Sequence, residues 1–442
     1  MMKDPNASQG RPPVSEFQRF NSTDSRAALD LISIVARLLF VNGQTTERME
    51  EAAAKIASRL GVRASVLPHW DELTVQVDDA AGSHYKIVAA SPVNMDMNKV
   101  AAAMGLVDRF CDGLSDPAEA KSRFESIDHF PPVSTVRFAL MAAAGAAALG
   151  VIFGVAHSLS LAAIAFSAGS GACLRRWLSE KSGNLFVQPF CAALLAGVVG
   201  AIVVRMRLSS ALRLVAVCPC MVLVPGPHFL NGAIDFVRGR VGLGAARFVY
   251  ANLITTMICV GLLIGLSLGG IRLPASGPFH SVAIEYDVTA AAVAVAAYGT
   301  FFAMPWRMLP VPILIGMFAH ALRWAAISLA GTSAVTGAFV ACFVVGVFMT
   351  PIADRLRLPF AGFAFASVVS LIPGLFLFQM AGGMVELATL RTGAPQDLAV
   401  QVLADGTTAI LVILAMGFGL IVPKMCIEHF VRPVAFGHSP SG

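Results

Sequence analysis

Hydrophobic and polar positions follow two different patterns along the chain, and the change falls near residue 130. Residues 26–43 place apolar side chains three and four positions apart and stop at Gly43, which is typical of a helix ended by glycine. A second helix is expected from Thr45-Thr46-Glu47, where a Thr side chain can cap free backbone N–H groups, to Leu60-Gly61.

Short segments of β-branched or alternating character follow at residues 63–68, 72–78 and 83–90, separated by turn residues. They predict a small antiparallel sheet. Residues 97–127 return to helical spacing, so residues 26–130 are expected to form a soluble cytoplasmic α+β domain. Residues 1–25 are rich in Pro, Ser, Asn and Gln and predict a disordered N-terminal segment.

Long apolar runs occupy the rest of the chain, and about 20 helical residues cross a bilayer core of ~30 Å. About ten such runs occur, at approximately 136–155, 158–174, 186–204, 212–237, 247–268, 288–304, 309–328, 332–350, 360–382 and 406–423. The second and sixth are short, so the count could differ by one. The predicted fold is a polytopic α-helical membrane protein with two five-helix units, at residues 131–270 and 271–442.

Composition agrees with this pattern. The chain is 56% hydrophobic and 13% charged with a mean hydropathy of +0.72, whereas soluble proteins are about 25% charged. The net charge of +5 comes from Arg residues between apolar runs, which indicates membrane orientation and no nucleic-acid partner. Basic loops place the N-terminal domain inside; the exception is 205–213, a basic segment on the expected outer side. The first residues contain no apolar stretch of the kind found in cleaved signal peptides.

Chemistry-bearing motifs are few. The eight Cys show no CxxC or Cys/His spacing, so no metal and no cofactor are indicated. Neither GxSxG nor HExxH occurs, which favours a protein that is not an enzyme. His69, Asp71 and Glu72 form a polar cluster that a membrane-tethered hydrolase could use, with an ordinary turn as the alternative.

The two membrane halves resemble each other. Val224-Pro225-Gly226 in the fourth run corresponds to Ile372-Pro373-Gly374 in the ninth, a spacing of about 148 residues. With a short insertion, Asp235 falls opposite Glu386. Five is an odd number of crossings, so a true repeat would place the second half upside down relative to the first. Inverted repeats are the architecture that many secondary transporters use for alternating access.

The Pro-Gly pairs predict broken helices. Proline lacks the N–H that a helix needs and clashes with the preceding turn, so Pro225-Gly226 and Pro373-Gly374 should each divide a crossing into half-helices. Freed backbone groups are tolerated in a membrane only where they face protein or a water-filled cavity. A half-helix can hold a carboxylate at its positive end, and exposed carbonyls can hold an ammonium group. An ordinary proline kink is the alternative.

Polar residues near these breaks complete the predicted substrate and proton pathway. A carboxylate that faces the bundle at Asp235 would suit proton binding and release, and a boundary carboxylate paired with Arg238 is the alternative. Asn231 and Gln379 offer hydrogen bonds to substrate or, alternatively, between helices. His320 and Arg323 could line the path or reach outward. The predicted pathway residues are Pro225, Gly226, Asn231, Asp235, Pro373, Gly374, Gln379 and Glu386.

Three segments resemble the threonine/serine exporter family in its fused form. They are LLFVNGQTTERMEEAAAKIASRLG, VPGPHFLNGAIDFVRGRVGLGAARFVYAN and SLIPGLFLFQMAGG. The resemblance implies a cytoplasmic domain, about ten helices in the plasma (inner) membrane, and export of L-threonine or L-serine by antiport with protons. It selects Pro225, Gly226, Asp235, Gly239 and Arg247 as family-like positions without assigning roles. Relatives with two separate membrane polypeptides export succinate, so dicarboxylate export is an alternative.

The expected partners are therefore a small polar substrate such as threonine or serine, protons and the lipid bilayer. A homo-oligomer is compatible with the sequence. The remaining alternatives are a hydrolase that acts through residues 26–130 and a membrane scaffold or sensor.

Overall fold

The computed structural model describes residues 22–80, 82–206, 212–271, 282–390 and 395–431. Residues 1–21 of the expected disordered segment therefore lie outside the described residues, as do residues 207–211 of the basic segment 205–213. Residues 22–25 form the first turn of a helix.

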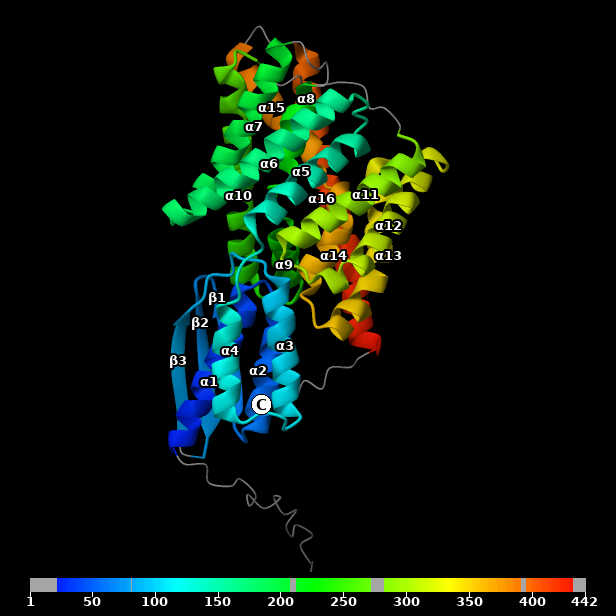
Figure 1. The fold of residues 1–442 in the computed structure, drawn as a ribbon. Helices are drawn as coiled ribbons and strands as arrows, with labels where there is room; N and C mark the ends of the chain where they lie inside the picture. Colours follow the sequence, from blue (N-terminus) through cyan, green and yellow to red (C-terminus); the bar gives the residue numbers. More distant parts are fainter. Residues whose placement is uncertain (1–21, 81, 207–211, 272–281, 391–394, 432–442) are drawn as a thin grey trace, which may run out of the picture.

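An N-terminal unit (residues 22–130) contains three strands and four helices (Figure 1). These are α1 (Ser22–Val41), α2 (Thr46–Arg59), β1 (Arg63–His69), β2 (Glu72–Asp79), β3 (Gly82–Ala89), α3 (Met97–Cys111) and α4 (Pro117–Asp128). The strands form an antiparallel meander in the order β1-β2-β3. Leu73, Val75 and Val77 of β2 alternate inward and are buried in the core that the helices share. The predicted sheet is confirmed.

The connection from α1 to α2 brings polar residues to the membrane helices. Gly43 ends α1 with a φ of 90°, a left-handed conformation that favours glycine. Thr45 occupies the N-cap position of α2, but its side chain makes no capping hydrogen bond. The predicted capping role is therefore wrong, and the hydroxyl of Thr46 forms a hydrogen bond with a membrane helix, described below.

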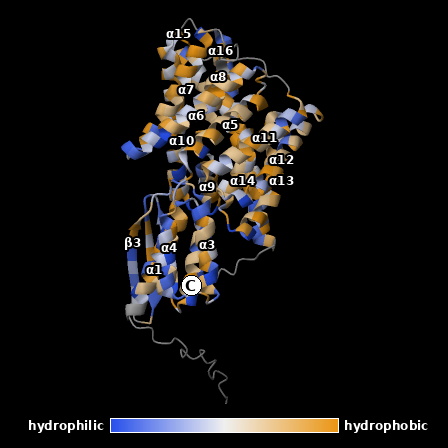
Figure 2. Ribbon diagram, viewed as in Figure 1, coloured by the Kyte–Doolittle hydropathy of each residue, from blue (hydrophilic) through white to orange (hydrophobic). Residues whose placement is uncertain are grey.

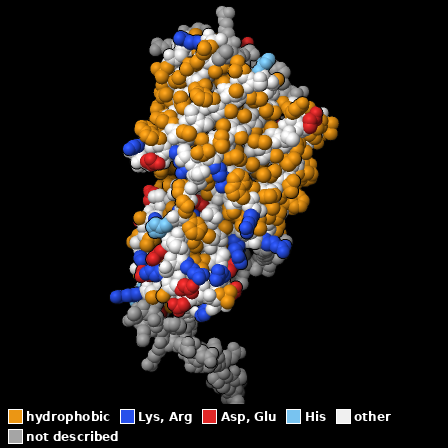
Figure 3. All heavy atoms as spheres, in the orientation of Figure 1, with side chains coloured by type: hydrophobic (Ala, Val, Ile, Leu, Met, Phe, Trp, Pro, Cys, Tyr) orange, Lys and Arg blue, Asp and Glu red, His pale blue; other side chains and the backbone are white. Residues whose placement is uncertain are grey.

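Long apolar helices make up the rest of the molecule. They are α5 (Thr135–Ile152), α6 (Ser158–Lys181), α7 (Val187–Arg205), α8 (Leu212–Met221), α9 (Gly226–Val237), α10 (Val241–Leu268), α11 (Ile284–Phe301), α12 (Pro310–Ser328), α13 (Ala334–Leu356), α14 (Phe360–Val368), α15 (Gly374–Leu390) and α16 (Gln396–Cys426), with short 3-10 turns at Trp306–Met308 (η1) and Val369–Leu371 (η2) and a π-helical turn at Ile427–Val431 (η4). Figure 2 shows their apolar character, and Figure 3 shows a broad hydrophobic surface with Lys and Arg side chains near the N-terminal unit.

Within the described residues, seven of these helices are long and apolar enough to cross a membrane, and the number rises to nine if each of two bent pairs counts as one span. The chain is therefore a multi-pass membrane protein. The sixth expected run corresponds to α11, which is not among the nine because Glu285 and Asp287 in its first turn lower its hydrophobicity. The expected count of ten stays a prediction.

Small residues allow the helices to approach closely. A Cβ added to Gly197 of α7 would lie 2.4 Å from the carbonyl oxygen of Leu262 in α10. A Cβ on Gly346 of α13 would lie 2.9 Å from the carbonyl oxygen of Gly419 in α16. The backbones of α7 and α10, and those of α13 and α16, therefore pack directly against each other.

Candidate functional site

Two crossings are broken where the sequence places Pro-Gly. The axis bends by 53° between α8 and α9 and by 65° between the α14–η2 segment and α15. Pro225 precedes the first residue of α9, and Gly374 begins α15. Both breaks contribute to one cavity of about 380 Å³, lined by Val224 and Gly226 from the first and by Ile372 and Pro373 from the second. The two breaks, far apart in the sequence, therefore lie beside each other.

The glycine of each break fits against the other broken pair. A Cβ on Gly226 would lie 1.5 Å from Cζ of Phe365 in α14, and a Cβ on Gly374 would lie 2.9 Å from Cγ of Met221 in α8. Tyr298 of α11 donates a hydrogen bond of 2.9 Å to the carbonyl oxygen of Met221, at the end of α8. The ring of Phe365 leaves no room for a larger residue at position 226.

Asp235 of α9 is buried in an ion pair. Its Oδ2 lies 3.0 Å from Nε of Arg247 in α10, and its Oδ1 accepts a 2.8 Å hydrogen bond from the hydroxyl of Thr46 in α2. The Asp235 and Arg247 side chains are only 2% and 1% exposed. The proposed pairing of Asp235 with Arg238 is wrong, because Arg238 binds Glu47 at 2.9 Å and Glu428 at 2.6 Å.

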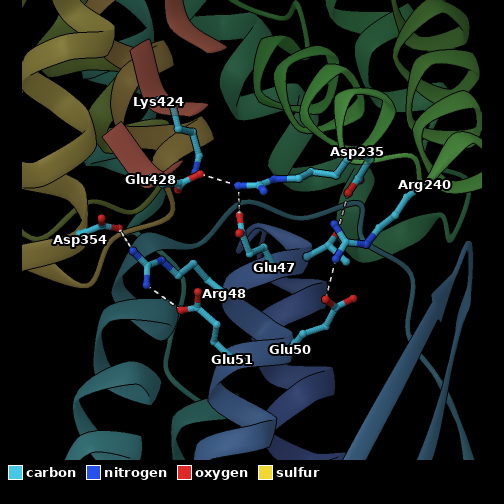
Figure 4. A network of polar contacts seen from close by, with 11 residues as sticks. Glu47, Arg48, Glu50, Glu51, Asp235, Arg240, Asp354, Lys424 and Glu428 are labelled. Carbon is cyan, nitrogen blue, oxygen red and sulfur yellow. Dashed lines mark hydrogen bonds and ion pairs between the residues drawn. The ribbon is translucent and has the colours of Figure 1, made fainter. Parts of the chain in front are cut away.

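A charged network surrounds this pair and joins α2 to both membrane halves (Figure 4). On the side of the first half, Arg240 lies 2.5 Å from Glu50. On the side of the second half, Arg48 forms an ion pair with Asp354 at the end of α13. Glu428, which follows α16, also pairs with Lys424.

Burial changes the acid strength of the α2 carboxyls, which lie outside the membrane-spanning helices. It raises the pKa of Glu47, and the neighbouring carboxylate of Glu428 raises it further. Burial also raises the pKa of Glu50 from its ordinary value, against the lowering effect of Arg240. The carboxylates of Glu47 and Glu50 therefore bind protons more readily than those of exposed glutamates do.

The other predicted pathway residues occupy different surroundings. Asn231 is buried, donates a 3.3 Å hydrogen bond to the carbonyl oxygen of Gly43, and has no partner for its Oδ1 within the described residues. Gln379 of α15 is buried, and its Oε1 likewise has no hydrogen-bond partner there. Glu386 is half-buried further along α15, whose label lies at the end of the molecule far from the N-terminal unit in Figure 1. The structure thus does not bring Glu386 to Asp235.

A polar cluster that the sequence did not single out lies beside the second break. His320 of α12 is fully buried; its Nδ1 lies 2.9 Å from Oδ2 of Asp287 and its Nε2 lies 2.5 Å from Oγ of Ser370. Of these three residues, the sequence analysis considered His320 as a possible path residue, and Asp287 lies just before the sixth expected run, at 288–304. The available signal was an acidic residue, Asp287, at the start of an otherwise apolar run.

The His69–Glu72 stretch forms a hairpin turn. His69 ends β1, Glu72 begins β2 directly opposite, and Asp71 between them has a φ of 70°. The carboxylate of Asp71 accepts a hydrogen bond from Ser91. Trp70 packs its ring 5.3 Å from that of Tyr250 in α10, so this turn contacts the membrane helices.

Two family models match the chain in the regions that carry these features. One, described as a threonine/serine exporter, matches residues 30–269, and another, described as Threonine/Serine exporter, ThrE, matches residues 287–426. The chain belongs to the threonine/serine exporter family. The first match contains Pro225 and Asp235, and the second contains Pro373, so each broken crossing lies in a family-matched half. This family is one of transporters rather than enzymes.

Individual relatives support the same assignment. The threonine/serine exporter of Corynebacterium glutamicum is 23% identical over 403 residues, which is 84% of this chain and 79% of the relative. The probable succinate transporter subunit YjjP of Klebsiella aerogenes is 25% identical over 100 residues, and that of Escherichia coli is 36% identical over 52 residues. The chain spans 39% and 20% of the length of these two relatives, and the matches cover 22% and 12% of the chain. No solved structure matches the chain.

Proposed function

We propose that this chain exports small polar amino acids, L-threonine and L-serine, across the plasma (inner) membrane, with the N-terminal unit in the cytoplasm. The observation that carries the proposal is the pair of adjacent broken crossings, one in each half of a chain that belongs to the threonine/serine exporter family. The Corynebacterium relative, which carries that name, matches along most of both chains.

The substrate pathway runs between the two breaks. Broken helices leave backbone N–H and C=O groups that can bind the carboxylate and ammonium of an amino acid in place of water. Asn231 and Gln379, whose carbonyl oxygens have no hydrogen-bond partner within the described residues, add neutral acceptors for a substrate hydroxyl or ammonium group.

The two membrane halves form an inverted repeat of five crossings each, with α11 as the sixth of ten. Corresponding helices support this arrangement. In each half the third and fifth crossings pack through glycines, and the fourth is broken. In Figure 1, α9 lies nearer the N-terminal unit than α8, whereas α14 lies nearer to it than α15. The broken pairs therefore run in opposite directions, as inverted repeats require.

Protons drive the export. The carboxylate of Asp235 is buried in the last turn of α9, and its ion-pair partner within the described residues is Arg247, so its charge state is tied to that contact. A movement that separates the pair would favour proton uptake.

Efflux from proteoliposomes tests the proposal. Vesicles preloaded with labelled L-threonine should release it in a protein-dependent manner, and an imposed proton gradient should accelerate release. A proton ionophore should remove the acceleration. Threonine release equal to that of protein-free vesicles would contradict the transport assignment, and release that ignores the ionophore would reject the coupling.

Dicarboxylate export is a second candidate, because the relatives with matches in part of the chain include succinate transporter subunits by name. A competition panel separates the two. Under the first proposal, labelled threonine should leave the vesicles and unlabelled serine should reduce its efflux. Under the second, labelled succinate should leave instead, and unlabelled succinate but not serine should reduce its efflux.

A further inference from the structure

A polar cavity of about 460 Å³ lies between the N-terminal unit and the first membrane half, on the side of the first break that faces α3. Ligand sites typically have volumes of ~300–1,000 Å³. The cavity is distinct from the apolar space that the two breaks share, although Val224 of the first break borders both. Pro225 also lines it, so the cavity reaches the start of α9.

One wall of the cavity is positively charged. Arg175 and Arg176, near the end of α6, both line it, and their Nε atoms have no hydrogen-bond partner within the described residues. Arg176 is anchored by a 2.7 Å hydrogen bond to the carbonyl oxygen of Val133, which leaves Arg175 as the less constrained of the two.

The N-terminal end of α9 adds positive charge to the same wall. Its positive dipole end meets the cavity at Pro225 and Pro227. His228 in the first turn is 7% exposed, lines the cavity, and has no hydrogen-bond partner for Nδ1 within the described part of the chain. Its ring is held edge-on against Tyr250 at 5.2 Å. A buried, oriented ring nitrogen without a partner indicates a site built for a polar ligand.

The opposite wall comes from the N-terminal unit and has different chemistry. Asp96, the N-cap of α3, supplies a carboxylate, and Asn42 and Asn94 supply amide groups. Lys99 also lines the cavity, but its Nζ donates to the carbonyl oxygen of Asp128 at 2.6 Å. The walls together offer cationic donors, a carboxylate and neutral amides at one cavity.

We propose that this cavity is an entry site that binds the carboxylate of the exported molecule through Arg175 and Arg176, beside His228 and the positive dipole end of α9. Arginine suits this role because its planar donors match a carboxylate. Asp96 takes the ammonium of an amino acid. This inference rests on the proposed function and deepens it, since it assigns the step before the substrate reaches the breaks.

Binding to the full-length protein in nanodiscs tests the site separately from transport. Isothermal titration would use L-threonine, succinate, and L-threoninol, the amino alcohol that lacks the carboxylate. Wild-type protein should bind a carboxylate and bind threoninol at least 10-fold more weakly, about 1.4 kcal/mol. Arg175→Gln should weaken carboxylate binding to the same degree and Arg175→Lys should restore part of it.

Two further variants complete the set. His228→Phe keeps an aromatic ring against Tyr250, removes both ring nitrogens, and should also weaken binding. Arg355→Gln changes an exposed arginine at the end of α13, outside the cavity, and should leave binding unchanged. Each variant is used only after its elution from size exclusion matches that of the wild type.

The outcomes separate the two proposals. Threonine binding with a loss in Asp96→Asn and in Arg175→Gln supports an amino-acid site, and succinate binding that is indifferent to Asp96→Asn supports a carboxylate site without the ammonium contact. Binding that survives in both Arg175→Gln and His228→Phe overturns the cavity assignment even when threonine efflux is intact. Failure of efflux with intact carboxylate binding to the cavity overturns the proposed function instead. A wild-type protein that binds neither L-threonine nor succinate overturns the assignment of an entry site.

Discussion

At the scale of single residues, the buried pair of Asp235 and Arg247 determines how the start of α2 meets the membrane helices. Each charge is compensated by the other, and the Thr46 hydroxyl satisfies the second carboxylate oxygen. Moving such groups out of water is costly, and their attraction repays the cost only while both are present. Removing one partner is therefore more damaging than removing both.

Replacing Asp235 by Asn should lower the free energy of unfolding by about 3–5 kcal/mol, because the Arg247 charge remains buried without a partner. The double variant Asp235→Leu/Arg247→Met should recover much of this loss. Thermal unfolding in nanodiscs measures both. Asp397→Asn, an exposed acid in the first turn of α16, is the matched control. Equal unfolding temperatures for Asp235→Asn and the control would refute the prediction.

Gly226 gives a second prediction at this scale. Alanine there would place its Cβ 1.5 Å from the ring of Phe365, so Gly226→Ala should destabilise the protein by about 1–3 kcal/mol. Phe365→Leu in the same chain should relieve the clash. Gly242→Ala, where no atom lies within 4 Å, should be silent. Unfolding temperatures report the three effects, and a Gly226→Ala protein as stable as Gly242→Ala would show that the two broken helices do not pack this closely.

At the scale of elements, α2 is the one helix of the N-terminal unit that forms ion pairs, within the described residues, with both membrane halves. Its Glu47 and Glu50 bind arginines that follow α9, and its Arg48 binds Asp354 of α13. Relative movement of the halves must shift or break some of these pairs. The position of α2 is therefore coupled to the arrangement of the membrane helices.

This coupling should depend on pH. Because burial raises the folded-state pKa of Glu47 and Glu50, their contribution to the docked state is complete below the ordinary glutamate pKa of about 4.3. It is lost as the pH rises through the raised values. Docking of α2 should weaken over that interval, which electron paramagnetic resonance would detect as a longer distance between spin labels at Lys55 and Arg355.

Glu47→Gln should flatten this pH profile while it keeps a hydrogen-bonding side chain beside Arg238. Glu119→Gln on α4, an exposed side chain whose ion-pair partner is Arg123 of the same helix, should leave the profile unchanged. A label distance that is constant with pH in the wild type, or a profile that Glu47→Gln does not alter, would contradict the assignment to this carboxyl.

At the scale of the whole molecule, the proposed ten crossings place each connection between helices on a defined side of the membrane. Ser182, after α6, should lie on the side of the N-terminal unit, and Pro395, before α16, on the opposite side. In a cysteine-free background, a membrane-impermeant thiol reagent should label Ser182→Cys from one side and Pro395→Cys from the other. Labelling of both from the same side would show that one expected crossing, α11 above all, does not span.

The local sequence was sufficient to predict the long helices, the sheet and the two breaks. The apolar run lengths located the long helices, the alternation in residues 63–90 located the sheet, and the missing N–H of Pro225 and Pro373 located both breaks. Such features act within one turn or one strand, so the sequence carries them directly. The family resemblance was likewise contained in short segments.

Contacts between distant segments were decided only by the tertiary structure. Asp235 has Arg238 three residues away, yet its partners are Arg247 and, from 189 positions earlier, Thr46. Thr46 stands where a capping role is plausible, yet packing directs its hydroxyl to α9. Glu386 corresponds to Asp235 in the predicted repeat, yet Asp235 is buried in an ion pair whereas Glu386 is only half-buried on α15. Side-chain partners depend on which helices meet and at what angle, and these follow from the packing of the whole molecule.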